Sequence, residues 1–488
     1  MKAKSESRLE LGGRAQRYLG LIAATLVLSS LAINLGLGRW GSFIGTPIRG
    51  LYLPDLLLIL GAALSFTQWR KVRLLPKTAL IFILPFVYLA LQTLLLTFQA
   101  PSSSLTLWVR DMAPFAYLSL VPLIALSLAS LKPQILVAVV RWASIVYAIS
   151  YTASYLGLVP AWVSTYSIAQ SATPFSYRED LTGFAVGIGI VAWGSWDFGL
   201  KRNILIQGCL VAVGLLVSSV AGLVTLLTLI FLSVLKDWSS SQFRGALKLF
   251  VVALLAGIFL SLSSAPSAPS APSAPSAPSA PSAPSAPSAP SAPSAGAVDE
   301  NRFSWFPTIP AVVDVLNLAS AGTTNARIDT WTDVGRYLSV GTNWVFGGGP
   351  GTDTLYFACT GIRTAPERTI LESNGKIAYL PKCGIDSSEA LSTLRDPHNW
   401  LLNLWLYHGI AGLLTFLLVL LIPLWTLRFQ TNYWLSTFGI LGILLVSSFG
   451  VILSAPFGLV PLTVFLAYLY SNRIRRQLLS EQTPSSLP

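Results

Sequence analysis

Residues 203–235 read NILIQGCLVAVGLLVSSVAGLVTLLTLIFLSVL, an uncharged run of 33 residues on which the topology of the whole chain depends. At about 1.5 Å per residue, this run is too long for one helix across a bilayer and short for two. As a single helix, it would place Lys201 and Lys236 on opposite sides of the membrane. As two helices that turn near Ser218-Ser219, it leaves them on the same side. Because basic residues collect on one side of a membrane, we predict a helical hairpin.

The composition of the chain is that of a polytopic membrane protein. Hydrophobic residues make up 53% of its 488 residues, charged residues only 11%, and the mean hydropathy is +0.64. A water-soluble domain is thereby excluded. We predict an all-α fold of about 12 transmembrane helices, with one long extracytoplasmic loop that contains short helices. The predicted spans are 18–37, 51–68, 78–98, 112–130, 135–157, 181–197, two within 203–235, 247–263, 400–427, 434–454 and 456–472.

The distribution of basic residues predicts the orientation. With the hairpin in place, 20 of the 32 Lys and Arg residues fall on the cytoplasmic side, including the clusters at 70–77, at Lys132 and Arg141, and at 473–476. Both termini are then cytoplasmic. Orientation alone accounts for the net charge of +12, so no nucleic-acid partner is needed to explain it.

The same topology divides the chain into segments. We predict a cytoplasmic N-terminal tail (1–17), helices 1 to 9 (18–263), a spacer (264–295), an extracytoplasmic loop (296–397), helices 10 to 12 (398–472) and a cytoplasmic tail (473–488).

The spacer consists of ten Ser-Ala-Pro triplets, from Ser264 to Pro293. Proline at every third position favours polyproline II, which at about 3.1 Å per residue reaches on the order of 90 Å. An O-glycosylated stalk is the alternative interpretation of this repeat.

The long loop contains two of the three cysteines, Cys359 and Cys383, whereas Cys209 lies in an apolar span. An oxidising exterior favours a disulfide between the loop cysteines, and two free thiols are the alternative.

A surface helix is predicted after the spacer, because Ile328, Trp331, Val334 and Leu338 follow helical spacing. The glycine-rich turn at 347–351 follows it. This turn lacks the Gly-Lys-Ser/Thr ending of a P-loop, so we interpret it mainly as structural, although its backbone amides could help to hold an anion.

One of the two histidines, His398, stands at the mouth of the last long apolar stretch in Asp396-Pro397-His398-Asn399. Imidazole titrates near neutral pH, so a histidine at a membrane surface beside arginines can exchange a proton. The alternative is a helix-start residue without a chemical role. Asp396 is expected to cap that helix or to orient His398.

The order of elements across residues 178–425 resembles the O-antigen ligase and Wzy-polymerase superfamily. Arg327 and Trp331 precede the glycine-rich turn and a variable insert, and His398-Asn399 then leads into an apolar helix. The resemblance implies a metal-independent glycosyltransferase without a cofactor, in the bacterial inner membrane. Such an enzyme takes a glycan from a polyprenyl pyrophosphate carrier at the outer face. The acceptor is a hydroxyl of lipid A core, of another glycan or of a protein, and the sequence leaves these three open.

The resemblance also implies roles for residues. External arginines hold the pyrophosphate, since guanidinium matches phosphate oxygens with two parallel hydrogen bonds. Arg327 is the first candidate and Arg178 the second. Arg110 is a weaker candidate, because the adjacent Asp111 can neutralise its charge. Arg336 is nine residues after Arg327, nearly on the opposite face of a helix, so only one of the two should point inward. For each, a lipid-headgroup anchor or a structural salt bridge is the alternative.

His398 is implied to act as general base on the acceptor, or to contact the pyrophosphate, with Asn399 beside it. The second histidine, His408, is expected to face away and deeper in the membrane, and receives no catalytic role. The chain departs from the family's pattern near Ser218-Ser219, where the family commonly carries an arginine and this sequence has none. Either Arg178 or another loop arginine replaces it, or the reaction is lost.

Two other classes of function compete with the enzyme. The first is an inorganic-anion transporter, such as one for bicarbonate. A transporter should carry ionisable groups or broken helices at mid-membrane, whereas from sequence the buried charge is essentially Asp55. The second is an inactive scaffold of an envelope assembly, which the missing arginine keeps open.

Overall fold

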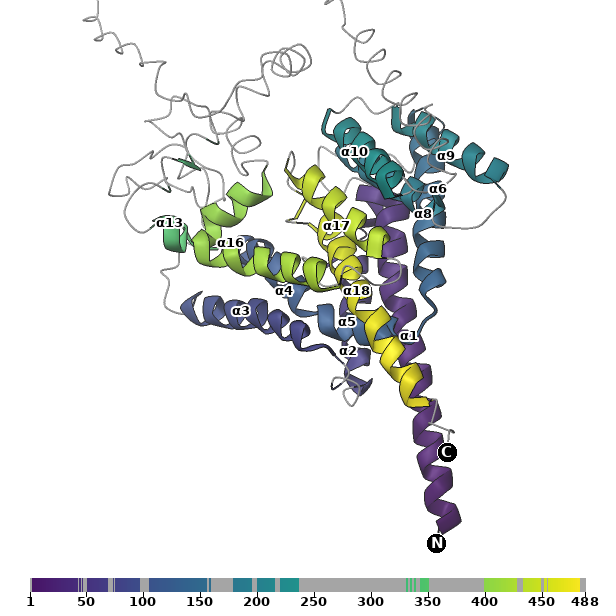
Figure 1. Cartoon of the computed structure of the whole chain (residues 1–488). Helices are drawn as coiled ribbons and strands as arrows, with labels where there is room; N and C mark the ends of the chain where they lie inside the picture. The colour runs from purple at the N-terminus through teal and green to yellow at the C-terminus, as the bar shows by residue number, and fades with distance from the viewer. Residues whose placement is uncertain are drawn as a thin grey trace, which may run out of the picture.

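The protein was analysed as a computed structural model, shown in Figure 1. It describes residues 2–42, 51–68, 75–96, 105–155, 179–194, 200–215, 220–236, 343–350, 399–427, 433–448 and 455–482, with a few isolated positions between them.

Within these described ranges the elements are helices, as the sequence predicts. They are α1 (Lys2–Ser42), α2 (Leu53–Ser65), η2 (Lys77–Phe82), α3 (Ile83–Leu96), α4 (Leu105–Ser119), α5 (Val121–Leu128), α6 (Pro133–Tyr155), α8 (Glu179–Gly194), α9 (Leu200–Leu215), α10 (Val220–Lys236), α13 (Asn343–Phe346), α16 (Trp400–Thr426), α17 (Tyr433–Ser447) and α18 (Pro456–Gln482).

Several of these helices fit a membrane. In the described part of the chain, four stretches are long and apolar enough to cross a bilayer: Tyr18–Gly38, Lys77–Leu95, Pro133–Ala153 and Trp400–Thr426. The bent pair α4 and α5 makes a fifth, if it is one span. Five further apolar helices are shorter. A helical membrane protein is therefore supported, and the arrangement of 12 spans stays a prediction. Of those spans, 247–263 lies outside the described residues.

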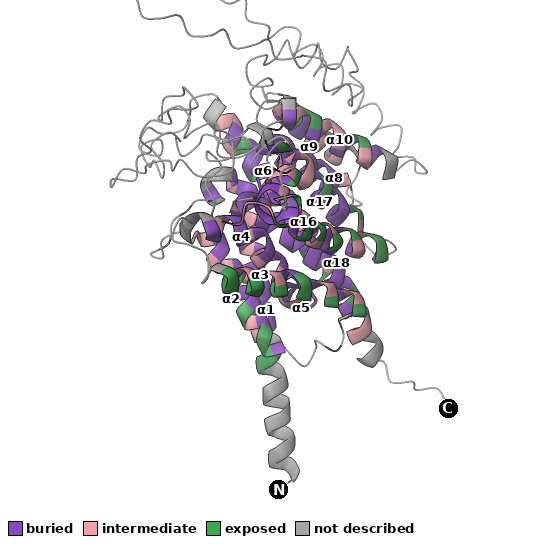
Figure 2. Ribbon diagram, turned by 90° about the vertical axis from the view of Figure 1, so that its left-hand side faces the viewer, coloured by how far each residue is buried: buried purple, intermediate pink, exposed green. Residues whose placement is uncertain are grey.

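Two features add detail to the predicted layout. The predicted tails are continuous with the helices, because α1 begins at Lys2 and α18 continues to Gln482. In addition, Figures 1 and 2 show α3 and the longer part of α16 running across the direction of α1 rather than along it.

The run at 203–235 is broken into two helices, which is what the hairpin interpretation predicts. α9 ends at Leu215 and α10 begins at Val220. A Cβ placed on Gly214 would touch the Leu226 side chain at 2.5 Å, so the end of α9 packs closely against α10. α10 also packs along α8. Van der Waals packing between helices thus holds the two halves, since a membrane supplies little hydrophobic force between them.

The core is centred on α18, α5, α16 and α17. Figure 2 shows buried residues concentrated in the middle of the bundle. α18 contributes an unbroken run of fully or nearly fully buried residues from Leu459 to Asn472. A helix that is buried all round must be surrounded by other helices. α18 is therefore the central element against which the first helices of the chain pack.

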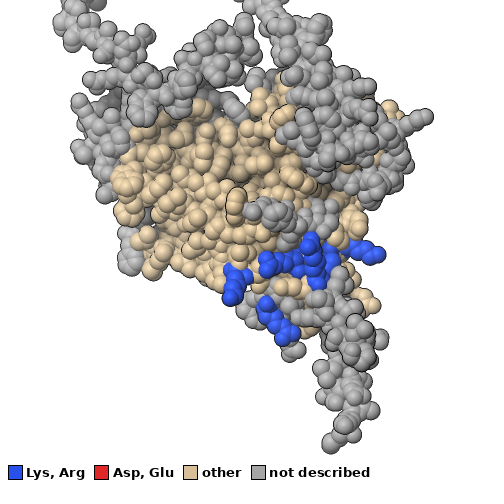
Figure 3. Space-filling model, in the orientation of Figure 1, with Lys and Arg blue, Asp and Glu red and all other residues tan. Residues whose placement is uncertain are grey.

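Basic side chains gather at one end of the bundle, where α1 begins and α18 ends (Figures 1 and 3). Those exposed there include Lys77, Lys132 and Arg473, which come from three distant parts of the sequence. All three belong to clusters that the sequence analysis assigns to the cytoplasmic side.

Candidate functional site

The Asn399 side chain stabilises the start of α16. Its backbone is extended (φ −145°, ψ 120°), and its Oδ1 accepts hydrogen bonds from the Leu401 and Leu402 N–H groups at 3.0 and 3.2 Å. Asn399 is therefore the N-cap of α16, the position for which the sequence analysis favoured Asp396. Its Nδ2 donates to the Ser448 carbonyl, at the end of α17, at 3.4 Å. The described contacts of Asn399, a predicted substrate-binding residue, thus serve the helix and its neighbour.

α16 is broken two turns after its start. Gly409 adopts φ 60° and ψ −169°, which is a left-handed φ that favours glycine. The break releases helix carbonyls that need other partners. The Gly348 and Gly349 N–H groups donate to the Leu406 and Tyr407 carbonyls at 2.7 and 3.1 Å. The glycine-rich turn is thus structural, as the sequence analysis concluded, and these two amides are engaged by α16 rather than presented to an anion.

Close approach explains why glycine stands on both sides of this contact. A Cβ on Gly347, whose φ is 70°, would lie 2.7 Å from the Leu406 carbonyl oxygen. A Cβ on Gly409 would clash with the Val345 carbonyl. The Trp405 indole N–H also donates to the Trp344 carbonyl at 2.9 Å. The segment before the turn is therefore packed against the first part of α16 and hydrogen-bonded to it.

Two residues of the predicted surface helix also pack against α16. Val334 and Leu338 are each 4% exposed and pack in one cluster with Leu406 and Tyr407 of α16. Their spacing of four residues puts them on one helical face. This agrees with the apolar face expected from the sequence. The described residues of the segment before α16 thus pack against its first turns.

The helix that contacts the start of α16, α17, also packs against α8 and α10. Gly183 near the start of α8 packs directly on Gly222 near the start of α10, where an added Cβ would clash with the Gly222 backbone. Gly442 of α17 lies against the Phe184 ring, where a Cβ would come within 2.9 Å. The end of α17 in turn bonds to Asn399 through Ser448. α17 therefore connects the start of α16 with the starts of α8 and α10.

Most predicted site residues lie outside the described part of the chain. These are His398, Arg327, Arg178, Arg336, Cys359 and Cys383. Their neighbours are described: His398 directly precedes Asn399, and Arg178 directly precedes α8. The structure thus describes the residues that follow His398 and Arg178, at the starts of α16 and α8.

Arg110 is described, and it pairs with its neighbour. Its Nε and one terminal nitrogen donate to the Asp111 carboxylate at 3.1 and 3.0 Å. The Arg110 side chain is 25% exposed and that of Asp111 is 1% exposed. This is the neutralising pair given as the alternative for Arg110. A buried carboxylate without a cation costs folding free energy. The Arg110 guanidinium therefore has a structural partner in Asp111, whether or not a ligand is bound.

His408 is buried among the described helices. It is 2% exposed, and both ring nitrogens have partners on other helices. Its Nε2 lies 3.1 Å from the Asp111 carbonyl oxygen, and its Nδ1 lies 3.3 Å from the Tyr88 hydroxyl. A carbonyl only accepts, so this geometry assigns the proton to Nε2 and makes Nδ1 the acceptor. Gln92 donates to the same hydroxyl at 3.1 Å. His408 therefore ties the α16 break to α3 and α4.

Sequence reasoning missed this network for a physical reason. Helical spacing gives the direction of His408 relative to His398 in an unbroken helix, whereas its partners come from residues about 300 positions earlier. Pro114 inside α4 was the available signal, because a proline removes a helix hydrogen bond and opens the preceding turn to other partners.

Arg141, which the sequence analysis counted in a cytoplasmic cluster, is buried against α8. It is 1% exposed, and its Nε and one terminal nitrogen donate to the Ala192 carbonyl near the end of α8, at 2.9 and 2.7 Å. Its guanidinium also lies over the Trp193 ring, 5.0 Å from the centroid. A cation at a helix C-terminus is favoured by the free carbonyls and the helix dipole. Buried charge is thus not essentially confined to Asp55.

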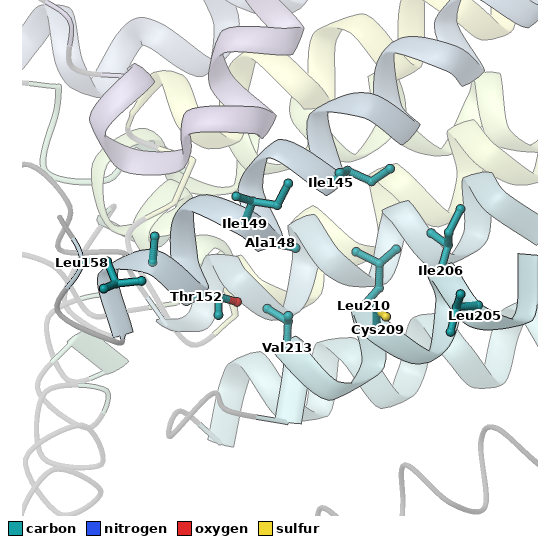
Figure 4. A pocket seen from close by; sticks show the side chains of 11 residues that line it. Ile145, Ala148, Ile149, Thr152, Leu158, Leu205, Ile206, Cys209, Leu210 and Val213 are labelled. Atoms are coloured by element: carbon teal, nitrogen blue, oxygen red, sulfur yellow. The ribbon is translucent and has the colours of Figure 1, made fainter. Parts of the chain in front are cut away.

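An apolar groove of about 510 Å³ lies between α6 and α9 (Figure 4). Ile149, Leu158 and Leu205 are among its lining residues. Thr152 and Cys209 supply the only heteroatoms among the lining side chains, and Cys209 is an exposed free thiol. The groove can pack against lipid chains, but it offers no group for glycosyl or proton transfer.

The sequence of this chain matches no family model and no curated protein.

Proposed function

We propose that the protein is a membrane glycosyltransferase of the O-antigen ligase or polymerase type. It would move a glycan from a polyprenyl pyrophosphate carrier to a hydroxyl acceptor at the outer face of the bacterial inner membrane. The acceptor oxygen bonds to the anomeric carbon as the carbon–oxygen bond to the pyrophosphate breaks. The hydroxyl proton passes to a base. Fixed positive charge stabilises the departing pyrophosphate.

The observation that carries this proposal is the meeting of helix ends around α17. Gly442 contacts Phe184, and Ser448 contacts Asn399. Six residues separate Gly442 from Ser448, about 9 Å along a helix, and six separate Phe184 from Arg178. In the proposed topology α8 and α17 run in opposite directions. Arg178 and His398 then belong to the same end of the bundle, as a pyrophosphate clamp and an acceptor base require.

The Gly183–Gly222 contact supports one explanation of the arginine that is missing near Ser218-Ser219, namely its replacement by Arg178. It brings the start of α8 against the start of α10, close in sequence to Ser218-Ser219. An arginine just before α8 can therefore replace the arginine that the family commonly carries after its seventh span. We propose that Arg178 has this role.

The docked loop supports a choice between Arg327 and Arg336. Val334 and Leu338 face α16. In a helix of the same register, Arg327 is seven residues before Val334, about 20° from it, whereas Arg336 is two residues after it, about 160° away. We propose that Arg327 points toward α16 and the reaction centre, and that Arg336 points away.

The proposal is tested in a deletion strain whose lipopolysaccharide and exopolysaccharide are profiled. We expect loss of a polymerised or ligated glycan, and its restoration by the wild-type gene. His398→Ala and Arg327→Ala should not restore it at equal membrane levels of protein.

Arg336→Ala is the matched control, because it removes the same charge from the same helix and should restore the glycan. A deletion strain with a normal glycan profile would contradict the proposal. Restoration by Arg327→Ala but not Arg336→Ala would reverse the register argument alone.

Inorganic-anion transport is a second candidate that gains from a specific observation. Broken membrane helices and buried ionisable groups are features of transporters. The break at Gly409, the buried His408 and the Arg110–Asp111 pair provide both kinds of feature. Bicarbonate uptake in the same deletion strain distinguishes the two functions. Reduced uptake with normal glycans favours transport, and normal uptake with altered glycans favours the enzyme.

A further inference from the structure

The basic end of the bundle forms a defined surface, here named the basic face. Its members are the exposed residues Arg73, Lys77, Lys132, Arg473 and Arg476 (Figure 3). They come from three segments that are up to about 400 positions apart in the sequence. The fold, rather than a local run of basic residues, therefore assembles this surface.

Hydrogen bonds from α18 hold the three segments together. The Tyr470 hydroxyl donates to the Thr78 carbonyl at 3.4 Å, next to Lys77. The Tyr468 hydroxyl donates to the Pro133 carbonyl at 3.0 Å, next to Lys132. Tyr468 and Tyr470 are about 160° apart around α18, so this helix lies between the two lysines.

A further bond fixes the end of α18. Arg475 donates to the Leu128 carbonyl at 3.3 Å, at the last residue of α5. The arginines on either side of it, Arg473 and Arg476, are exposed. The positions of Lys77, Lys132, Arg473 and Arg476 are therefore set by packed, hydrogen-bonded helices.

The described carboxylates are engaged elsewhere. Of the acidic residues whose side chains the structure describes, Asp55 accepts a hydrogen bond from Tyr117, and Asp111 accepts from Arg110. Both of these carboxylates therefore have partners outside the basic face. Five like charges on one surface repel one another and attract an anionic partner.

The surface beside the basic face is apolar. After Lys77 come Leu80 and Ile83, which are 63% and 52% exposed, and after Lys132 comes Ile135, which is 38% exposed. A ligand with phosphate at one end and hydrocarbon at the other would match both parts. An acidic peptide or a nucleic acid would match only the charges.

We propose that the basic face binds anionic phospholipids, with the lipid phosphate at the cations and the acyl chains along the adjacent apolar helices. Phosphatidylglycerol and cardiolipin belong to this class. Polybasic surfaces at a membrane boundary attract such lipids. This inference does not depend on the proposed enzymatic function.

The test uses the purified full chain in detergent with mixed micelles of phosphatidylglycerol and phosphatidylcholine, and counts the bound lipids by native mass spectrometry. We expect phosphatidylglycerol to be retained preferentially. The triple variant K132Q/R473Q/R476Q should lose affinity for it by about fivefold for each charge removed. Raising the ionic strength should weaken retention by the wild type in the same direction.

The matched control is K2Q/K4Q/R8Q, which removes the same charge from the predicted cytoplasmic side but outside the basic face. It should retain the lipid. Equal loss in both triple variants would overturn the proposal, because net charge alone would then explain binding. Equal retention of the two lipids, or release of phosphatidylglycerol by inorganic phosphate at the same ionic strength, would also overturn it. Salt dependence in the wild type keeps the test valid if a variant misfolds.

Discussion

At the scale of single residues, buried charge and hydrogen bonding are the main findings. Arg141, Asp111 and His408 are all buried, and each has partners on another segment or on its neighbour. Polar groups within a membrane protein must be satisfied internally, since lipid offers no hydrogen bonds. These residues therefore specify how the helices fit together, whichever function the protein performs.

The His408 network can be tested by substitution. His408→Leu leaves the Tyr88 hydroxyl without its ring acceptor, and it should cost roughly 1–3 kcal/mol of unfolding free energy. His408→Gln keeps a donor for Asp111 and an acceptor for Tyr88, so it should recover part of that loss. Thermal unfolding of the purified variants measures both. Equal stability of the leucine variant and the wild type would show that the network contributes nothing.

At the scale of elements, the break in α16 and the glycine-rich turn depend on one another. The break frees carbonyls of Leu406 and Tyr407, and the turn supplies the amides of Gly348 and Gly349. The sequence predicted the turn and its structural role from the glycine run. It did not predict the partner, because each donor lies 58 positions before its acceptor and no local pattern records that contact.

Gly409→Ala tests this element. A left-handed φ in a non-glycine residue costs about 1–3 kcal/mol, and the added Cβ would clash with the Val345 carbonyl. We expect a lower Tm than in the wild type. Gly208→Ala is the matched control, because a Cβ at Gly208 of α9 meets nothing within 4 Å. It should be neutral or slightly stabilising. If the two variants unfold at the same temperature, the α16 contact is not a stabilising one.

At the scale of the whole molecule, the distribution of charge and the break in residues 203–235 bear on the predicted topology. The exposed basic residues of the described helices gather where α1 begins and α18 ends (Figure 3). The break of residues 203–235 into α9 and α10 agrees with a hairpin. Cytoplasmic termini and an external loop at 264–397 stay predictions from the sequence.

Reporter fusions check this topology. A cytoplasmic reporter placed after Arg202 or after Lys236 should be active, and a reporter that works only outside should be active within the spacer at 264–293. Two helices in 203–235 keep the first two sites on the same side. A reporter after Lys236 that is active only outside the cytoplasm would disprove the hairpin.

The sequence by itself determined the helical membrane class, the break in residues 203–235, the apolar face at Val334 and Leu338, and the structural role of the glycine-rich turn. These properties follow from hydropathy, charge and helical period, which are local in the chain. Only the tertiary structure decided that Asn399 caps α16, that Arg141 bonds to α8, that His408 joins α3 and α4, and that five cations form the basic face. Each of these depends on contacts between distant residues, and a sequence records the residues but not which of them meet.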